Sequence, residues 1–207
     1  MCGFVSTKIS IDDRIRIVKP EESLSIPKVV TVNKFNEEAA AKFSTDMEKA
    51  VNTGQPIIPI VIDSFGGHVY SLLAMVDVIK NCPIPVATVA VGKAMSCGAV
   101  LLSCGDEDFR FISPNATVMI HDVSNYPGGK LEEIKADVKE AERMDTIIFK
   151  LMDSNCGQKS GYFKKLVHSH GHADWFLTPK DVVKHNLANS IKIPGFEVRV
   201  GMEVSFS

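Results

Sequence analysis

Residues 57–103, IIPIVIDSFGGHVYSLLAMVDVIKNCPIPVATVAVGKAMSCGAVLLS, contain two strand-to-helix units in succession. Ile57–Asp63 is an almost unbroken apolar run, which is typical of a strand buried on both faces of a parallel sheet. After two glycines, the apolar residues of segment 68–81 recur at helical spacing, which predicts a helix with one buried face. Residues 86–92 repeat the strand pattern, and residues 97–103 predict a second, apolar helix. Strands that alternate with helices predict an α/β fold with a mostly parallel sheet.

The flanking sequence extends this alternation in both directions. Val29–Val32 is a short β-branched strand, and Asn36 is placed to cap a helix that runs to about Val51. Downstream, segment 110–121 contains two strand pieces separated by Ser-Pro-Asn, and residues 131–155 show the apolar stripe of a long amphipathic helix. The pattern therefore predicts one continuous α/β domain.

Length and patterning place the boundaries of this domain. A chain of 207 residues is long enough for one compact domain with a sizeable core. The regular pattern covers residues 28–193, which we take as the domain. Residues 1–27 contain one alternating, strand-like stretch followed by a break, and residues 194–207 form a C-terminal tail.

Composition and charge exclude several classes of protein. The 23 Lys and Arg residues against 25 Asp and Glu give a net charge of −2, which predicts binding neither to nucleic acid nor to an anionic membrane. We predict no membrane span and no secretory signal, because no apolar segment has the required length and continuity. The five cysteines are odd in number and scattered, which predicts reduced thiols in a cytoplasmic, or equivalent reducing, compartment.

Ser96 lies at a junction where a nucleophile is chemically well placed. In GKAMSCGA (residues 92–99) it follows a predicted buried strand and precedes a helix, so unpaired N–H groups of the helix N-terminus surround it. Such groups stabilise an oxyanion, and the hydroxyl is a potential nucleophile. The alternative is a simple helix cap, and Ala94 excludes the G-x-S-x-G motif of α/β-hydrolases. Gly66 and Gly67 form another place where the backbone can approach a ligand closely. The alternative is that they form only a tight turn between strand and helix.

One histidine and one aspartate are candidate partners for this serine. His121 ends the predicted strand TVMIH, where open α/β sheets bind ligands, so it is a candidate general base; the alternative is a core histidine with satisfied hydrogen bonds. Asp174, before Trp-Phe, is a candidate to orient an imidazole. Asp122, Asp63 and Asp181 compete for that role on the residues alone.

His168, His170 and His172 raise the hypothesis of a metal site. No carboxylate or thiol stands with them in the sequence, so a solvated loop is the simpler interpretation and no metal site is predicted. Cys97 is an alternative nucleophile, but no base is placed for it in preference to Ser96.

Five motifs together resemble the Clp protease proteolytic subunit (ClpP) family. Their order and spacing match that family over roughly residues 57–192. The motifs are DSFGG (residues 63–67), GKAMSCGAVLL (92–102), ISPNATVMIH (112–121), the Gly-Gly pair at 128–129 with the long helix after it, and HADWFLTPKDVVKHNLANSI (172–191).

The resemblance implies a fold and a set of site residues. The fold would be a crotonase-like spiral of βα units, with the helix at about 131–155 as a protruding handle. Ser96 would be the nucleophile, His121 the general base and Asp174 the carboxylate that orients the imidazole. The backbone N–H groups of Gly67 and Cys97 would form the oxyanion hole.

The resemblance also implies an assembly. Family members form heptameric rings, stacked in pairs around a closed chamber, and a Clp-family AAA+ unfoldase feeds unfolded protein into it. ATP would be used by that partner, and this chain would need no cofactor. Residues 1–27 would shape the axial pore or contact the partner.

Three positions depart from the family pattern, and two other functions remain open. Phe65 replaces a proline, Cys97 a methionine, and Ala173 an arginine that helps to couple the rings. The expected function is a serine endopeptidase that cleaves unfolded proteins and short peptides through an acyl-enzyme. The alternatives are a non-catalytic ring subunit and an acyl-CoA enzyme of the crotonase type, which shares the fold and the oxyanion hole.

Overall fold

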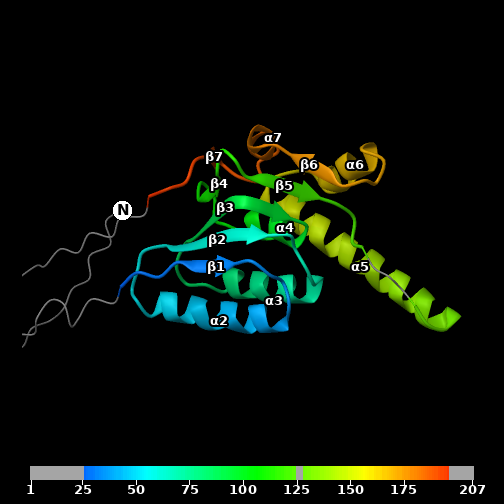
Figure 1. Cartoon of the computed structure of the whole chain (residues 1–207), viewed down its shortest axis with the longest axis horizontal. Coiled ribbons are helices and arrows are strands. Elements are labelled where there is room, and N and C mark those ends of the chain that lie inside the picture. Colours follow the sequence, from blue (N-terminus) through cyan, green and yellow to red (C-terminus); the bar gives the residue numbers. More distant parts are fainter. Residues whose placement is uncertain (1–25, 125–127, 196–207) are drawn as a thin grey trace, which may run out of the picture.

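One sheet organises the molecule (Figure 1). The computed structural model describes residues 26–124 and 128–195, so the predicted segments 1–27 and 194–207 lie almost wholly outside it. Within the described residues the sheet has seven strands: β1 (Val30–Val32), β2 (Ile58–Ser64), β3 (Val86–Met95), β4 (Arg110–Ile112), β5 (Thr117–Ile120), β6 (Trp175–Leu177) and β7 (Ser190–Ile191). Strands β1, β2, β3, β4 and β7 are parallel neighbours in this order, β5 pairs in parallel with β3, and β6 pairs antiparallel with β5. The predicted α/β fold with a mostly parallel sheet is confirmed.

Strand β3 is longer than the segment 86–92 predicted from its apolar pattern, because along the edge opposite β2 it has two partners in succession. Its first half pairs with β4 through Thr88–Ala90, and its last three residues, Lys93–Met95, pair with β5. Met95 lies opposite Met119 in this pairing. The carboxyl ends of β3 and β5 therefore meet at one edge of the sheet, and so do the residues that follow them.

Six helices are described; the first four begin close to the predicted positions, and the last two were not predicted from the sequence. They are α2 (Glu37–Val51), α3 (Val69–Lys80), α4 (Cys97–Leu102), α5 (Leu131–Asn155), α6 (Tyr162–Ser169) and α7 (Pro179–Lys184). Asn36 caps α2 as predicted, since its side chain accepts a 2.8 Å hydrogen bond from the N–H of Ala39. Helices α2 and α3 lie together along one side of the sheet, whereas α6, β6 and α7 lie together at its far end (Figure 1).

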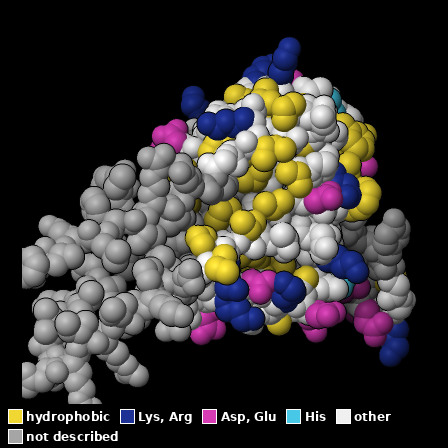
Figure 2. All heavy atoms as spheres, turned by 60° about the vertical axis from the view of Figure 1, so that its left-hand side comes forward, with side chains coloured by type: hydrophobic (Ala, Val, Ile, Leu, Met, Phe, Trp, Pro, Cys, Tyr) yellow, Lys and Arg dark blue, Asp and Glu magenta, His cyan; other side chains and the backbone are white. Residues whose placement is uncertain are grey.

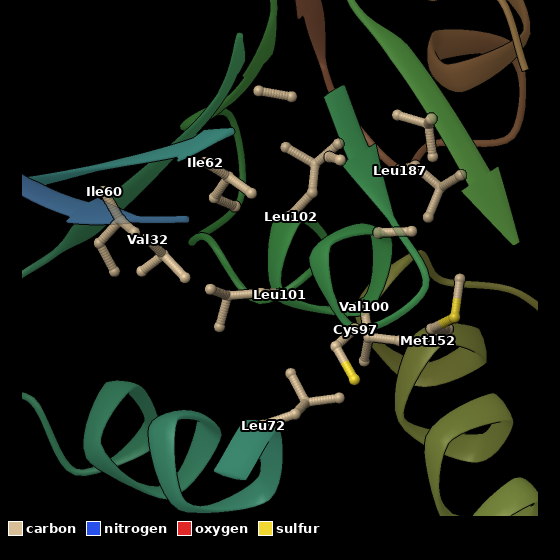
Figure 3. Packing of buried hydrophobic residues seen from close by; sticks show 14 of the residues in the cluster. Val32, Ile60, Ile62, Leu72, Cys97, Val100, Leu101, Leu102, Met152 and Leu187 are labelled. Carbon is tan, nitrogen blue, oxygen red and sulfur yellow. The ribbon is translucent and has the colours of Figure 1, made fainter. Parts of the chain in front are cut away.

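The main hydrophobic core lies between the sheet and its helices. All six residues of α4 are buried, which explains why this short segment is apolar on every side. Figure 3 shows side chains of β1, β2, α3, α4 and α5 converging around α4: Val32, Ile60, Ile62, Leu72, Val100, Leu101, Leu102 and Met152. Burial of each large aliphatic side chain stabilises the fold by about 1.5–3 kcal/mol. The helix that follows Ser96 is thus fixed by packing.

The prediction that Ile57–Asp63 is buried on both faces is only partly correct. Ile58, Ile60 and Ile62 are fully buried in the main core. The intervening Val61 is only half-buried, because its face of the sheet packs in a smaller cluster with Val89 and a few neighbours. Figure 2 shows hydrophobic side chains in a broken band across one face of the molecule, with charged side chains around it.

Helix α5 leaves the body of the molecule at its N-terminal half (Figure 1). All its buried residues lie between Met144 and Asp153, whereas Leu131 and Val138 are exposed. The second half therefore packs on the core and the first half projects away from it. In the described part of the chain, no helix combines the length and apolarity that a bilayer crossing requires.

Candidate active site

Ser96 occupies a strained position between β3 and α4. Its φ of 55° and ψ of −119° lie outside the ordinary regions for a side-chain-bearing residue, at a cost of about 1–3 kcal/mol. Its N–H donates a 2.8 Å hydrogen bond to the carbonyl of Met119, which ties the turn to the end of β5. The Ser96 hydroxyl makes no hydrogen bond that caps α4. The alternative that Ser96 is a simple helix cap is therefore wrong.

His121 directly follows β5 and faces this hydroxyl. Its Nε2 lies 2.8 Å from Ser96 Oγ, within hydrogen-bond range. The imidazole side chain is 22% exposed, so it stands at the rim of the site, and the alternative of a satisfied core histidine does not apply. The pairing of Met95 with Met119 explains the approach, because Ser96 and His121 come one and two residues after these partners.

Asp174 reaches the other nitrogen of His121 from the antiparallel strand. Ile120 pairs with Trp175 across β5 and β6, so the residues just beyond this pair, His121 and Asp174, lie side by side. Asp174 Oδ1 is 3.6 Å from His121 Nδ1, which is ion-pair range but longer than a hydrogen bond, and the carboxylate is 53% exposed.

The three competing aspartates have other partners. Asp63 pairs with Lys93 at 2.6 Å on the surface. Asp181 accepts a hydrogen bond from the hydroxyl of Thr178 at the start of α7, and this bond lowers the pKa of the carboxyl. Asp122 lies beside His168 and His172 instead. Of these four aspartates, only Asp174 lies within ion-pair range of His121.

Two backbone N–H groups lie beside Ser96. Gly67 and Cys97 line the same cavity as Ser96 and His121. Among the described residues, neither N–H donates to a backbone carbonyl, as expected for Cys97 at the first position of α4. Gly67 has φ of 150°, and a Cβ there would collide with the carbonyl oxygen of Phe35, so this position requires glycine. Two donors are thus free to bind an oxyanion.

The thiol of Cys97 supports this loop and is a poor nucleophile. It donates a 3.2 Å hydrogen bond to the carbonyl of Gly67, which links the two cavity-lining residues whose N–H groups are unpaired among the described residues. Burial raises the pKa of the thiol to about 11, so it stays protonated near neutral pH. The alternative of a Cys97 nucleophile is therefore disfavoured.

The cavity has a polar edge and an apolar wall. Its volume is about 50 Å³, and its polar edge is formed by Gly67, Ser96, Cys97, His121, Asp122 and Ser124. The apolar wall comes from α3, α4, α5 and the end of β5: Val69, Leu72, Val100, Ile120, Ile148, Phe149 and Met152. An apolar side chain of a bound peptide fits such a wall better than a charged one.

The three clustered histidines are not a single loop. His168 belongs to α6, His170 stacks on Trp175 with ring centroids 5.1 Å apart, and His172 lies in the turn before β6. His168 and His172 face Asp122, a carboxylate that the sequence pattern did not connect with them. The interpretation as a solvated loop is wrong for His168, which lies on α6, whereas His172 does lie in an exposed turn. The position of Asp122 directly after a strand-end histidine was the only available signal.

Comparison with known proteins agrees with this architecture. The family model described as Clp protease matches residues 13–193. A protein of Deinococcus radiodurans named "ATP-dependent Clp protease proteolytic subunit" is 30% identical over 146 residues, which is 70% of each chain. The match begins at residue 13, which is upstream of residue 28, the predicted start of the domain. Since it covers most of the sequence and spans every strand and helix described above, the chain belongs to the Clp protease family.

Proposed function

We propose that this ClpP-type protease is a serine endopeptidase that cleaves unfolded proteins and short peptides. The observation that carries the proposal is the 2.8 Å approach of His121 Nε2 to Ser96 Oγ, on a backbone turn that holds the hydroxyl at the cavity. A nucleophile within hydrogen-bond reach of a base, with a carboxylate behind the base, is the arrangement of covalent acyl transfer.

The reaction follows from the geometry in two halves. Ser96 Oγ attacks the scissile carbonyl while His121 Nε2 takes its proton, and the oxyanion accepts hydrogen bonds from the N–H groups of Gly67 and Cys97. The proton then passes from His121 to the leaving amine as the peptide bond breaks and the acyl-enzyme remains. In the second half, His121 removes a proton from water, which attacks the ester and releases the acid and Ser96. Each oxyanion donor contributes about 3–4 kcal/mol to transition-state stabilisation.

Asp174 has the role of a positioning group in this scheme. Its carboxylate would accept a hydrogen bond from Nδ1–H of His121, fix the tautomer and stabilise the imidazolium. The 3.6 Å separation must shorten to do so, and catalytic hydrogen bonds commonly tighten when substrate binds.

The assembly that we propose is a homo-oligomeric heptameric ring, single or stacked as a double ring, that is fed by a Clp-family AAA+ unfoldase. The projecting half of α5, with exposed Leu131 and Val138, is a surface suited to contact a second copy. The name of the D. radiodurans relative supports an ATP-dependent partner. ATP would act in that partner, and this chain would need no cofactor. The four described cysteines are free, which supports a reducing compartment such as the cytoplasm.

Labelling with a fluorophosphonate, together with cleavage of a short peptide, tests the proposal. Ser96→Ala should abolish labelling and lower cleavage by at least about a thousandfold, because the nucleophile is lost. Ser160→Ala, at an exposed position away from the site, is the matched control and should behave as the parent. Labelling that persists in Ser96→Ala would contradict the assignment.

A non-catalytic ring subunit is the second candidate function. The observation that favours it is the long, solvent-exposed approach of Asp174 to His121. Active-site titration of the purified protein separates the two functions. A stoichiometric burst of acyl-enzyme supports the protease, and its absence in an intact ring supports the structural subunit.

A further inference from the structure

A second cluster of chemically active side chains lies beside the serine site. Asp122, His168 and His172 border a pocket of about 350 Å³ between the end of β5, α5 and α6. One carboxylate oxygen and one nitrogen from each imidazole all lie within 4.8 Å of one another. His168 and His172 are four residues apart, whereas Asp122 comes from a distant part of the chain, and the fold brings it beside them.

The separations in this cluster match those around a bound metal ion. Asp122 Oδ2 is 3.0 Å from His172 Nδ1, and Asp122 Oδ1 is 3.4 Å from His168 Nε2. Ligand atoms at about 2.0–2.1 Å from a tetrahedral zinc ion are about 3.3 Å apart. A metal ion could therefore bind here once the three ligand atoms, which lie within 4.8 Å of one another, close to about 3.3 Å.

One atom of the cluster is buried without a hydrogen bond, although it lies within ion-pair range of His168. Asp122 Oδ1 is buried and accepts no hydrogen bond from any described residue. Buried carboxylate oxygens are normally satisfied, because an unpaired polar atom costs about 1–3 kcal/mol. A cation between the carboxylate and the two imidazoles would satisfy it. The missing hydrogen bond of Asp122 Oδ1 is an observation independent of the spacing of the ligand atoms.

The segment that carries Asp122 is already held in place. The N–H of Val123 donates a 3.2 Å hydrogen bond to Asp145, a buried residue of α5, and Lys164 of α6 pairs with the other oxygen of the same carboxylate at 2.7 Å. Lys164, which lines the same pocket, is thus ion-paired with Asp145 rather than with Asp122.

We infer that Asp122, His168 and His172 bind a divalent transition-metal ion of the zinc type. Two imidazoles and one carboxylate suit zinc and its neighbours in the first transition series, whereas Ca²⁺ and Mg²⁺ prefer oxygen ligands. The remaining coordination positions are open to water in the pocket. The ion would join Asp122, which follows His121, to His172, which lies two residues before Asp174. It would therefore clamp together the two segments that hold His121 and Asp174.

Titration of the untagged, metal-free protein with Co²⁺ tests the inference without reference to protease activity. We expect a saturable one-to-one complex with the intense visible absorption of low-coordinate Co²⁺, and displacement of this signal by Zn²⁺. Asp122→Asn and His172→Asn should each weaken binding by at least about tenfold, as loss of a ligand requires. His172 is 59% exposed, so its substitution leaves the fold intact.

His170→Ala is the matched control, because His170 lies in the same segment but outside the cluster. It should bind Co²⁺ as the parent does. Hydrogen exchange at residues 121–124 and 170–174 should slow on addition of Zn²⁺ in the parent and in His170→Ala, but not in His172→Asn. No saturable binding, or binding that Asp122→Asn and His172→Asn leave unchanged, would overturn the inference.

Discussion

The backbone of Gly66 packs directly against the side chain of Ser96. A Cβ on residue 66 would lie 2.8 Å from Ser96 Cβ and 2.9 Å from the carbonyl oxygen of Met95, and φ of Gly66 is +102°. No side-chain-bearing residue fits there without moving the turn that carries the Ser96 hydroxyl. The turn after β2 thus sets the position of a residue that is 30 positions away in the sequence.

Gly66→Ala should therefore impair the site more than the fold. A displacement of about 1 Å at a nucleophile costs about a hundredfold in rate, so we expect fluorophosphonate labelling to slow by that order. Gly128→Ala is the control, since no atom lies within 4 Å of a Cβ built there. Parent-like labelling in Gly66→Ala would show that the turn tolerates the shift.

Asp174→Asn should lower peptide cleavage by at least about a hundredfold, because the amide cannot stabilise the imidazolium of His121. Asp181→Asn is the matched control, as Asp181 serves only the start of α7 through Thr178. Steady-state kinetics at one pH compare the two variants. If Asp174→Asn cleaves at the parent rate, another group orients His121.

Cys97 should resist alkylation although it neighbours Ser96. The pKa of its thiol is raised to about 11 by burial, so the reactive thiolate is scarce at pH 8. Mass spectrometry after treatment with iodoacetamide should find Cys82, which is half-buried, modified before Cys97. Cys97→Ala keeps the backbone N–H and should keep fluorophosphonate labelling. Loss of labelling in that variant would assign the thiol itself a role.

His185 should make the fold less stable in mild acid. Burial lowers its pKa below the ordinary value of 6.5, and its Nδ1 lies 2.7 Å from the hydroxyl of Tyr162. Between the lowered pKa and 6.5 the unfolded chain binds more protons than the folded one, so the free energy of unfolding falls as pH decreases through this window. Urea titrations of the parent and of His185→Gln at several pH values measure this fall in the free energy of unfolding. The fall should be smaller in the variant. Equal falls would exclude His185 as the cause.

The sequence predicts the individual residues of this site better than it predicts which of them lie together in the fold. Ser96 and His121 are recognisable as residues that follow buried strands, because that edge of a parallel sheet collects ligand-binding groups. The residues alone do not select Asp174 from four aspartates. That choice depends on the antiparallel pairing of β6 with β5, which no local pattern encodes. Only the family resemblance selects Asp174.

The same limit explains what sequence reasoning missed. Asp122 and His168 are 46 residues apart, and only the packing of α6 against α5 and the end of β5 brings them together. Val61 was predicted to be buried on both sides because apolar runs record average burial, whereas a single chain covers the two faces of its sheet unequally. The predictions for residues 1–25 and 196–207 lie outside the described residues.

Peptide mapping of the fluorophosphonate adduct by mass spectrometry tests the serine–histidine mechanism most directly. The mechanism predicts one phosphonylated residue, Ser96, in the parent protein, and a loss of adduct of at least about a thousandfold in His121→Ala, where no base remains to take the proton. An adduct on any other residue, or undiminished modification of Ser96 without the imidazole, would contradict it.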